Sequence, residues 1–561
     1  MMMVFQTRGK VMTVLVWTLM ALMLSGAADG HRIFGSFKRG RFGRNSFFKP
    51  GMRTQDSSGA PKYMSRAEAE KMYAVRLKQT QESLQAFAPS SGPAPAPGPV
   101  PVPLTAPSSV PAPNDTAKAP APGRIFHVTE YGADPTGASD STQALMSAII
   151  DAFSLSTEDQ LMPGVSDFGG AEIHLQGGNY KLSSPLRLPG GGGGNLLIHG
   201  GTLRASENFP KDRYLIELWS PASTKINTSL NSAELVTALQ NTVDGNSDQT
   251  ASYEDITLRD LMLDANFRGG GILVIHSIRT NIDNCYISHF TSEGIMVQRG
   301  HETYIRNSFI GQHITAGGSS NERSFSGTGI SLLGNDNAVT DVIIFSAAVG
   351  IDVTGQANAF IGVHCYNKAT GFGGVGIRLR LPGLTQTRIL SCYMDYTGIV
   401  AEDPVQLEIT NSFFLGDGTI TLKSGQKKVV KGVNIVDNAF SGGGNGVPIV
   451  QLDGSFDTVE QTVVDRNNAY GMSLKSTVAR GTVQGNGTTW TVDFSPFLLF
   501  PNHIQHVQYS FYNPVESSFP RHALRSVANN KVVVESDVAV PATVAVTVDQ
   551  SATFVQQGIY S

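Results

Sequence analysis

The sequence is poor in cysteine and in charge, and both shortages narrow the classes of protein that it can encode. Only three cysteines occur in 561 residues, too few for a disulfide framework, so burial and hydrogen bonds must hold the fold. Charged residues make up 16% of the chain, with 42 Lys and Arg against 46 Asp and Glu. No strongly basic domain stands out, which disfavours a nucleic-acid-binding protein. The apolar content of 40% suffices for a sizeable core and argues against a charge-rich disordered chain.

Long apolar runs are also missing, with one exception near the amino terminus. Arg8 and Lys10 precede an apolar run over Val11–Leu24, which small residues follow, as in a secretory signal. The run has about 14 residues, short for a membrane span of roughly 20. We therefore predict a signal peptide over residues 1–28 and export from the cell, with a retained anchor as the alternative. Three sequons fit a secreted chain, and we predict glycosylation at Asn114, Asn227 and Asn486.

The charge is unevenly distributed along the chain. Residues 1–60 hold nine Lys or Arg against two acids, so the remainder is acidic. We interpret residues 29–88 as a basic arm followed by a short helix. The arm either binds a polyanion or the cell wall through long-range attraction, or it is a processed propeptide or a disordered stretch. Residues 89–123 are rich in Ala and Pro, which predicts an extended, semi-rigid linker.

From residue 124 onward, short β-branched runs alternate with Gly, Asn and Asp, and helical patterns are almost absent. Similar runs recur roughly every 20–30 residues, a spacing that indicates a solenoid. The closest match is a right-handed parallel β-helix, in which each coil adds one rung about 4.8 Å from the next. We take the following positions as equivalent: Asn284, Asn307, Asp341, Gly362, Ser391, Asn411 and Asn438. We expect a row of side chains to stack inside the coils: Tyr286, Phe309, Ile343, Tyr393 and Phe413.

The sequence also predicts the structure at both ends of this solenoid. Asp140–Thr142 begins an amphipathic run that predicts a helix covering the open first coil. The coil repeat fades near residue 470, and alternating runs such as KVVVES and TVAVTV follow it. We therefore predict an all-β protein with a parallel β-helix over 124–470, an N-terminal cap helix, and a small antiparallel β domain over 471–561.

Several segments resemble a known family. FHVTEYGADPTGASDSTQALMSAIIDAF, at 126–153, is similar to the opening of pectate-lyase-like β-helices. RGHETYIRNSFIGQH, GNDNAVTDVIIFS and VHCYNKATGFGGVGI resemble the quartet-type polygalacturonases of plants. The resemblance implies a secreted glycoside hydrolase, a polygalacturonase, that acts on pectic polygalacturonate in the cell wall.

The family's usual site motifs, NTD, a DD pair, GHG and RIK, are not intact in this chain. Asn281–Asp283 keeps only the N-x-D form, Asp336 is a single acid where a pair is usual, and His364 lies in GVHC in place of GHG. The catalytic residues must therefore be sought from the geometry that the repeat implies.

Hydrolysis of a glycosidic bond usually requires two carboxyl groups, one protonated and one ionised. Counting back five residues from the equivalent positions places Arg279, Glu302 and Asp336 in one column, and counting back six places His301 beside Asn335. We predict that Glu302 and Asp336 are the acid/base pair, that His301 assists them, and that Arg279 and Asn335 bind substrate. The alternative is that Asn335 and Asp336 only form a turn and cap backbone groups.

A second group of candidates lies downstream. Lys368 and Arg388 are suited to binding uronate carboxylates, since a bidentate guanidinium matches a planar anion. His364 and Asp395 are further substrate-binding candidates, although His364 also reads as a buried core histidine beside Cys365. The acids Glu402 and Asp403 accompany this group.

No cofactor motif accompanies these residues, and we predict that the protein needs neither metal nor cofactor. Asp264–Asn266 and Asp352 are either calcium ligands or corner turns. We expect a secreted monomer with a pectic polysaccharide as partner and without nucleic-acid or membrane binding. Two rival functions stay open: a cation-dependent lyase of the same fold, and a wall-binding β-helix without turnover.

Overall fold

The computed structural model describes residues 124–155, 159–219, 252–313, 325–366, 374–514 and 519–551, all of which belong to one unit, Asp115–Ser561. The predicted signal, arm and linker lie outside the described residues, as do Lys368, Asn114 and Asn227. Among the described residues, no helix combines the length and apolarity needed to cross a membrane.

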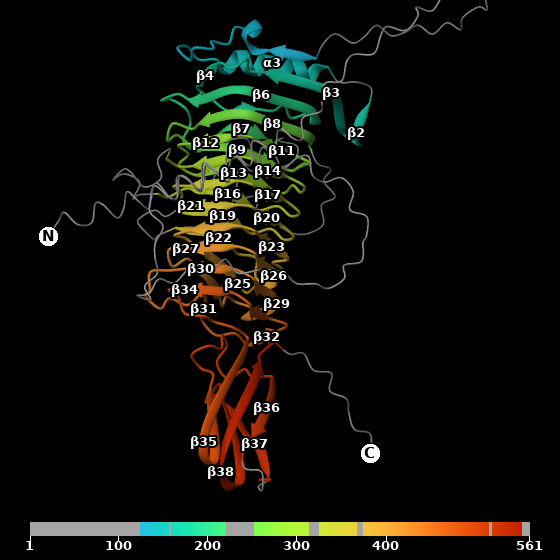
Figure 1. Ribbon diagram of the computed structural model, residues 1–561. Helices are drawn as coiled ribbons and strands as arrows, with labels where there is room; N and C mark the ends of the chain where they lie inside the picture. Colours follow the sequence, from blue (N-terminus) through green and yellow to red (C-terminus); the bar gives the residue numbers. More distant parts are fainter. Residues whose placement is uncertain are drawn as a thin grey trace, which may run out of the picture. The chain divides into compact units, whose positions relative to one another are not determined.

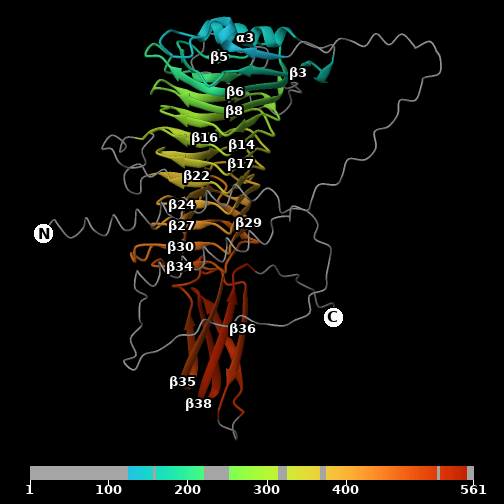
Figure 2. The same cartoon turned by 45° about the horizontal axis from the view of Figure 1, so that its top comes forward.

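The described chain is a parallel β-helix whose rungs each contain strands on three faces (Figures 1 and 2). The first face is a ten-stranded sheet. Its strands are β5 (Leu186–Arg187), β7 (Tyr214–Leu218), β9 (Gly270–Ile275), β13 (Glu293–Gln298), β16 (Thr328–Leu332), β19 (Val349–Val353), β22 (Val375–Leu379), β25 (Ile399–Glu402), β28 (Ile420–Lys423) and β31 (Val450–Asp453).

The second and third faces together form a 24-stranded sheet. The second face holds β10 (Ser277–Ile278), β11 (Asn281–Asp283), β14 (Tyr304–Arg306), β17 (Ala338–Thr340), β20 (Ala359–Ile361), β23 (Thr387–Leu390), β26 (Val405–Thr410), β29 (Val429–Val436), β32 (Thr458–Glu460) and β33 (Val463–Asp465). The third face holds β12 (Tyr286–Ser288), β15 (Phe309–Gly311), β18 (Ile343–Phe345), β21 (His364–Tyr366), β24 (Tyr393–Asp395), β27 (Phe413–Leu415), β30 (Ala439–Ser441) and β34 (Asn468–Tyr470).

The first rungs use longer strands that run along the second face and the third. These are β6 (Gly193–Ala205), which pairs with β3 and β4, and β8 (Tyr253–Asp264), which pairs with β11 and β12. The remaining elements at this end are β1 (Ile125–His127), η2 (Val128–Tyr131), α3 (Thr142–Ser154), β2 (Gln160–Met162), β3 (Val165–His174) and β4 (Asn179–Leu182).

The prediction of a cap helix is confirmed. Helix α3 starts directly after Ser141, and its Leu145, Ala148, Ile149 and Ala152 are buried in the core that runs through the coils. Figure 2 shows α3 over the first rung. At the other end, Leu499 and Phe500 belong to the same core. Apolar side chains therefore close both ends of the stack, where the last rung would otherwise expose its interior.

Two corners of each rung turn through a left-handed residue, and these residues stack in two columns. The first corner lies between the first and second faces, and its left-handed residues are Asp255, Arg279, Glu302, Asp336, Ala357, Gln386, Gln406, Gly432 and Gln461. The second corner follows five residues later, with Asp260, Asn284, Asn307, Asp341, Gly362, Ser391, Asn411, Asp437 and Arg466. Left-handed backbone is unfavourable for most side chains and easiest for Gly, Asn and Asp, which explains their recurrence in the sequence.

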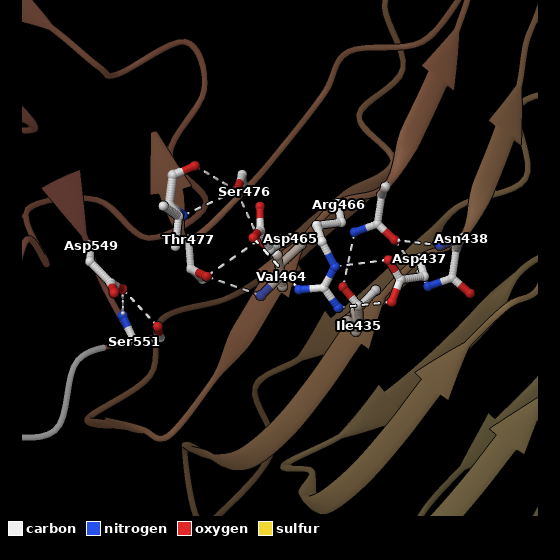
Figure 3. A network of polar contacts seen from close by, with 12 residues as sticks. Ile435, Asp437, Asn438, Val464, Asp465, Arg466, Ser476, Thr477, Asp549 and Ser551 are labelled. Atoms are coloured by element: carbon white, nitrogen blue, oxygen red, sulfur yellow. Dashed lines mark hydrogen bonds and ion pairs between the residues drawn. The ribbon is translucent and has the colours of Figure 1, made fainter. Parts of the chain in front are cut away.

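The predicted register is confirmed from Asn284 to Asn411 and is wrong at the last position. Pairing of β27 with β30 places Asp437, and not Asn438, above Asn411. Asn438 instead points inward: its backbone N–H and its side-chain amide both donate to Asn467 Oδ1, at 2.9 and 3.0 Å. Outside it, Arg466 donates two hydrogen bonds to Asp437 (Figure 3). An amide ladder inside and an ion pair outside thus hold this corner together.

The aromatic row expected inside the coils lies outside them. Phe309 and Phe413 are exposed, Tyr286, Ile343 and Tyr393 are half-buried, and the next residue of each strand faces the core. The second position after the left-handed corner residue points outward, so the inward row is Ile287, Ile310, Ile344, Cys365, Met394, Phe414 and Phe440.

The last part of the described chain is a four-stranded antiparallel sheet of β35 (Val478–Asp493), β36 (His506–Tyr512), β37 (His522–Ala528) and β38 (Lys531–Asp549). It has its own core around Trp490, Val534 and Val544. Val464 of the last rung and Thr477 exchange hydrogen bonds at the junction (Figure 3). Asn486, a predicted glycosylation site, is exposed in β35.

The left-handed corners make a first prediction. Asn411 is exposed with φ +52°, and Asn411→Val should lower the free energy of unfolding by about 1–2 kcal/mol because a β-branched side chain strains this conformation. Asn411→Gly should stay within roughly 0.5 kcal/mol of the native chain. Urea unfolding checks both, with Thr410→Val in the adjoining strand as control. Equal effects of Val and Gly would contradict the role of the corner.

Candidate functional site

The first corner brings together the residues that the repeat predicted there. Ile278, His301 and Asn335 form successive isolated bridges, so Arg279, Glu302 and Asp336 follow them on three successive rungs. Each of these three residues has φ near +55°, and the turn directs its side chain away from the core. The column is therefore both a structural corner and a line of polar side chains; its catalytic role stays a prediction.

Arg279 is held by two glutamates. Its guanidinium contacts Glu254 Oε1 on the rung before, and its Nε lies 3.0 Å from Glu302 Oε2 on the rung after. Glu254 first, and then Glu302, raise the pKa of Arg279. The sequence predicted that Arg279 binds a substrate carboxylate, and this stays a prediction, since its side chain is 56% exposed beside the two glutamates. Arg279 thus orients Glu302.

Asp336 differs from Glu302 in its surroundings. It is exposed, and its carboxylate has no hydrogen-bond or ion-pair partner among the described residues. Its neighbour Asn335 accepts a hydrogen bond from Gln356 N–H at 2.9 Å, which fixes the turn. His301, also exposed, lies beside Asn335. The structure thus has Glu302 and Asp336 on adjacent rungs of one column, with Glu302 in an ion pair.

Sequence reasoning missed Tyr304, which lies two residues after Glu302. Its side chain is 42% exposed and pairs in register with Ala338 of the next rung. The ring therefore stands beside the acidic corner with only a methyl group next to it on that side. An exposed aromatic ring flanking two carboxylates is a suitable platform for the apolar face of a sugar. The sequence does contain a signal for Tyr304: it is a large aromatic residue whose equivalents on the next rungs are small.

The outer surface of the first face holds a second polar group that sequence reasoning missed. Arg378 Nε and Arg380 Nε each donate to Asp352 Oδ1 at 2.9 Å. Burial acts to raise the pKa of Asp352, but the two arginines outweigh it and lower the pKa. The sequence left Asp352 as a calcium ligand or a corner residue; it is not at a corner, because it lies within β19. It holds two guanidinium groups side by side, with side chains 36% and 46% exposed.

The downstream candidates do not form one site. Arg388 lies on the second face beside Glu408, at 3.7 Å, whereas His364 and Asp395 lie on the third face, with 3.9 Å between His364 Nε2 and Asp395 Oδ2. His364 points outward from the core but is largely covered: its side chain is 19% exposed, and it stacks on Tyr393 with 4.4 Å between ring centroids. Because strands adjacent in sequence belong to different faces, residues close in number point in different directions.

The acids Glu402 and Asp403 have structural partners. Glu402 lies 3.4 Å from Lys423 on the next strand. Asp403 is fully buried and accepts hydrogen bonds from the N–H groups of Gly425, Lys427 and Val429. Asp403 therefore anchors a loop. Across the described ranges, no three or more His, Cys, Asp or Glu side chains cluster in a way that would hold a metal ion.

The burial of His364 predicts a pH effect on stability. Burial lowers its pKa from 6.5 to about 4, so between these values the unfolded chain binds the extra proton and stability rises with pH. As the pH falls from 6.5 to 4, this effect should lower the free energy of unfolding of the native chain by roughly 3 kcal/mol. His364→Phe, which keeps the ring stack, should remove that part of the loss. Unfolding titrations at both pH values measure this. An unchanged pH slope in the variant would contradict it.

The sequence was compared with family models and with curated proteins. No family model matches the chain. Polygalacturonase QRT3 of Arabidopsis thaliana is 58% identical over 444 residues, which cover 78% of this chain and 87% of that protein.

Solved structures are similar to this chain at low identity only. ORF18 of Geobacillus virus E2 is 12% identical, with 74% of this chain and 78% of that chain covered and a TM-score of 0.46. The A-module of the mannuronan C-5 epimerase AlgE6 of Azotobacter vinelandii is also 12% identical, with coverages of 62% and 98% and a TM-score of 0.38. Neither likeness bears on function. The 58% identity to the polygalacturonase extends over most of both sequences. The chain therefore belongs to the polygalacturonase family.

Proposed function

We propose that this protein is a pectin-degrading glycoside hydrolase that cleaves the α-1,4 links of polygalacturonate at the first corner. The observation that carries the proposal is the 58% identity to a polygalacturonase over 444 residues. The geometry adds a place for the chemistry, because Glu302 and Asp336 occupy the same turn on adjacent rungs. Glycosidases work with two such carboxyl groups.

The two carboxyl groups take different roles. Glu302 is paired with Arg279 at 3.0 Å, which suits an ionised base that activates water. Asp336 occupies the same turn on the next rung, and we assign it as the acid that protonates the leaving oxygen. We assign His301, exposed beside Asn335, an assisting role in proton transfer, and the Tyr304 ring a contact with the sugar.

Substrate carboxylates are bound on the first face. Arg378 and Arg380 use part of their N–H groups on Asp352, and the remaining donors are available to uronates, which a planar guanidinium recognises well. Asp352 already holds both side chains through hydrogen bonds, so less rotamer freedom is lost on binding. They act in addition to the uronate-binding residues that the sequence predicts: Arg279, Lys368 and Arg388.

We further propose that the protein acts outside the cell, at the cell wall, as a monomer and after removal of residues 1–28. The charged start, apolar run and small-residue exit of that segment support export. Exposure of Asn486 in β35 supports glycosylation there.

Substitution of the acidic pair tests the catalytic assignment. Glu302→Gln and Asp336→Asn should each lower kcat on de-esterified polygalacturonate by about 10²- to 10⁴-fold, the usual contribution of a general acid or base. Asp255→Asn is the matched control, since Asp255 is an exposed acid in the same corner column and should leave kcat unchanged. New reducing ends measure turnover, and thermal melting confirms folding.

The absorbance of an unsaturated product is followed in the same assay. Reducing ends without that absorbance establish hydrolysis. An absorbance that rises with turnover and disappears on chelation would make the protein a lyase and overturn the acid/base assignment. Binding without turnover would leave a wall-binding β-helix.

The arginine pair makes a separate prediction. Arg380→Gln removes a charged donor, and KM for polygalacturonate should rise about tenfold or more, as expected for a hydrogen bond to a charged group, while kcat changes little. Arg466→Gln, an exposed arginine of the second corner that Asp437 holds, serves as control. Equal KM values for native and Arg380→Gln protein would exclude Arg380 from the binding surface.

A further inference from the structure

The third corner of the early rungs, between the third and first faces, carries an aromatic side chain in an unfavourable conformation. Phe267 has φ +55° and is 44% exposed. A bulky residue adopts left-handed backbone less readily than Gly, Asn or Asp. An exposed ring contributes little to the core, so packing does not account for a phenylalanine here. Glycine would make the same turn without strain.

The Phe267 ring belongs to a group of rings from successive rungs. Its centroid lies 4.8 Å from that of His289 and 5.2 Å from that of His313. Phe325 continues the group, 5.2 Å from His313. The loops before β9, β13 and β16 supply these side chains. Phe267 is therefore fixed in place while much of its ring remains open to solvent.

His289 is oriented by a carboxylate. Its Nδ1 lies 2.7 Å from Asp264 Oδ1, which also accepts the N–H of Asn266 at 2.9 Å, and Arg204 Nε lies 3.4 Å from Asp264 Oδ2. Burial acts to raise the pKa of Asp264, but the hydrogen bond from His289 leads the effects that lower it. Since Asp264 engages Nδ1, the Nε2 atom is the nitrogen that His289 presents to a ligand.

This corner is separate from the proposed catalytic corner. His289 precedes β13 and His301 follows it, and a strand of this length spans about 20 Å. Between the two ends, the outer side chains of the first face pack into a buried apolar cluster: Tyr214, Trp219, Leu273, Ile275 and Met296. The cluster therefore lies on the first face between the two corners.

We propose that Phe267, His289 and Arg204 form a second sugar-binding site that takes one uronosyl unit of a pectic chain. The C–H face of the pyranose ring stacks on the exposed ring of Phe267. His289 Nε2 bonds a hydroxyl or carboxylate oxygen, and the Arg204 side chain, 54% exposed, pairs with the carboxylate. The site holds polymer on the enzyme and takes no part in bond cleavage. Its ligand class rests on the proposed function.

Binding of tetragalacturonate to the full-length Asp336→Asn protein tests the proposal. Hydrogen exchange followed by mass spectrometry reports protection at residues 264–268 and 289–292 separately from residues 301–304 and 335–337. We expect protection of both regions. The additional change Phe267→Gly should abolish protection at 264–268 and 289–292 and weaken binding there at least tenfold. It should leave the first corner unaffected.

Two controls separate function from folding. Phe267→Gly relieves backbone strain, so its melting temperature should equal or exceed that of the parent. Phe413→Ala removes a similarly exposed ring from the third face and should leave both protected regions unchanged.

The second site is overturned if the Phe267→Gly variant keeps hydrogen-exchange protection at the third corner. It is also overturned if the parent protein shows no protection there. Loss of protection at the first corner alone counts against the proposed function and leaves this site standing.

Discussion

The structure depends on one repeated constraint: the chain must turn through a left-handed residue at the same two points of every rung. The two columns, five residues apart, set where each strand ends and the next begins. Because each rung turns in the same way, the strands pair in parallel register and the core rows coincide. Side chains at the turns then stack at the rung spacing of about 4.8 Å, including Glu302 and Asp336. The same geometry that builds the fold therefore positions the acidic pair.

Much of this fold can be predicted from the sequence because left-handed turns favour particular residue types. Asn, Asp and Gly recur at the second corner, and they gave the correct register from Asn284 to Asn411. The register failed at Asn438 because Asp437 also favours the turn, and the buried Asn438 amide has a separate task in the internal ladder. The aromatic row was placed inside because apolar character alone does not tell which of two alternating positions faces the core.

The candidate site was less predictable because ion pairs across rungs leave no local motif. Glu254 and Arg279 lie 25 residues apart, and nothing near either residue indicates their contact. Likewise, Arg378 and Arg380 meet Asp352 only through the pairing of β19 with β22. Two arginines separated by one inward residue were the available signal, since alternation places both on one side of a strand. Phe267 carried no sequence signal, because its left-handed backbone appears only in the structure.

We propose that polygalacturonate lies across the first corner, with the scissile bond between the side chains of Glu302 and Asp336 and neighbouring carboxylates on Arg378 and Arg380. The most direct measurement is a crystal structure of the Asp336→Asn protein with bound oligogalacturonate. We expect a glycosidic oxygen within hydrogen-bond reach of Asn at position 336 and a uronate carboxylate bound to Arg378 and Arg380. A sugar chain bound over His364 and Asp395 on the third face, with the first corner empty, would contradict it.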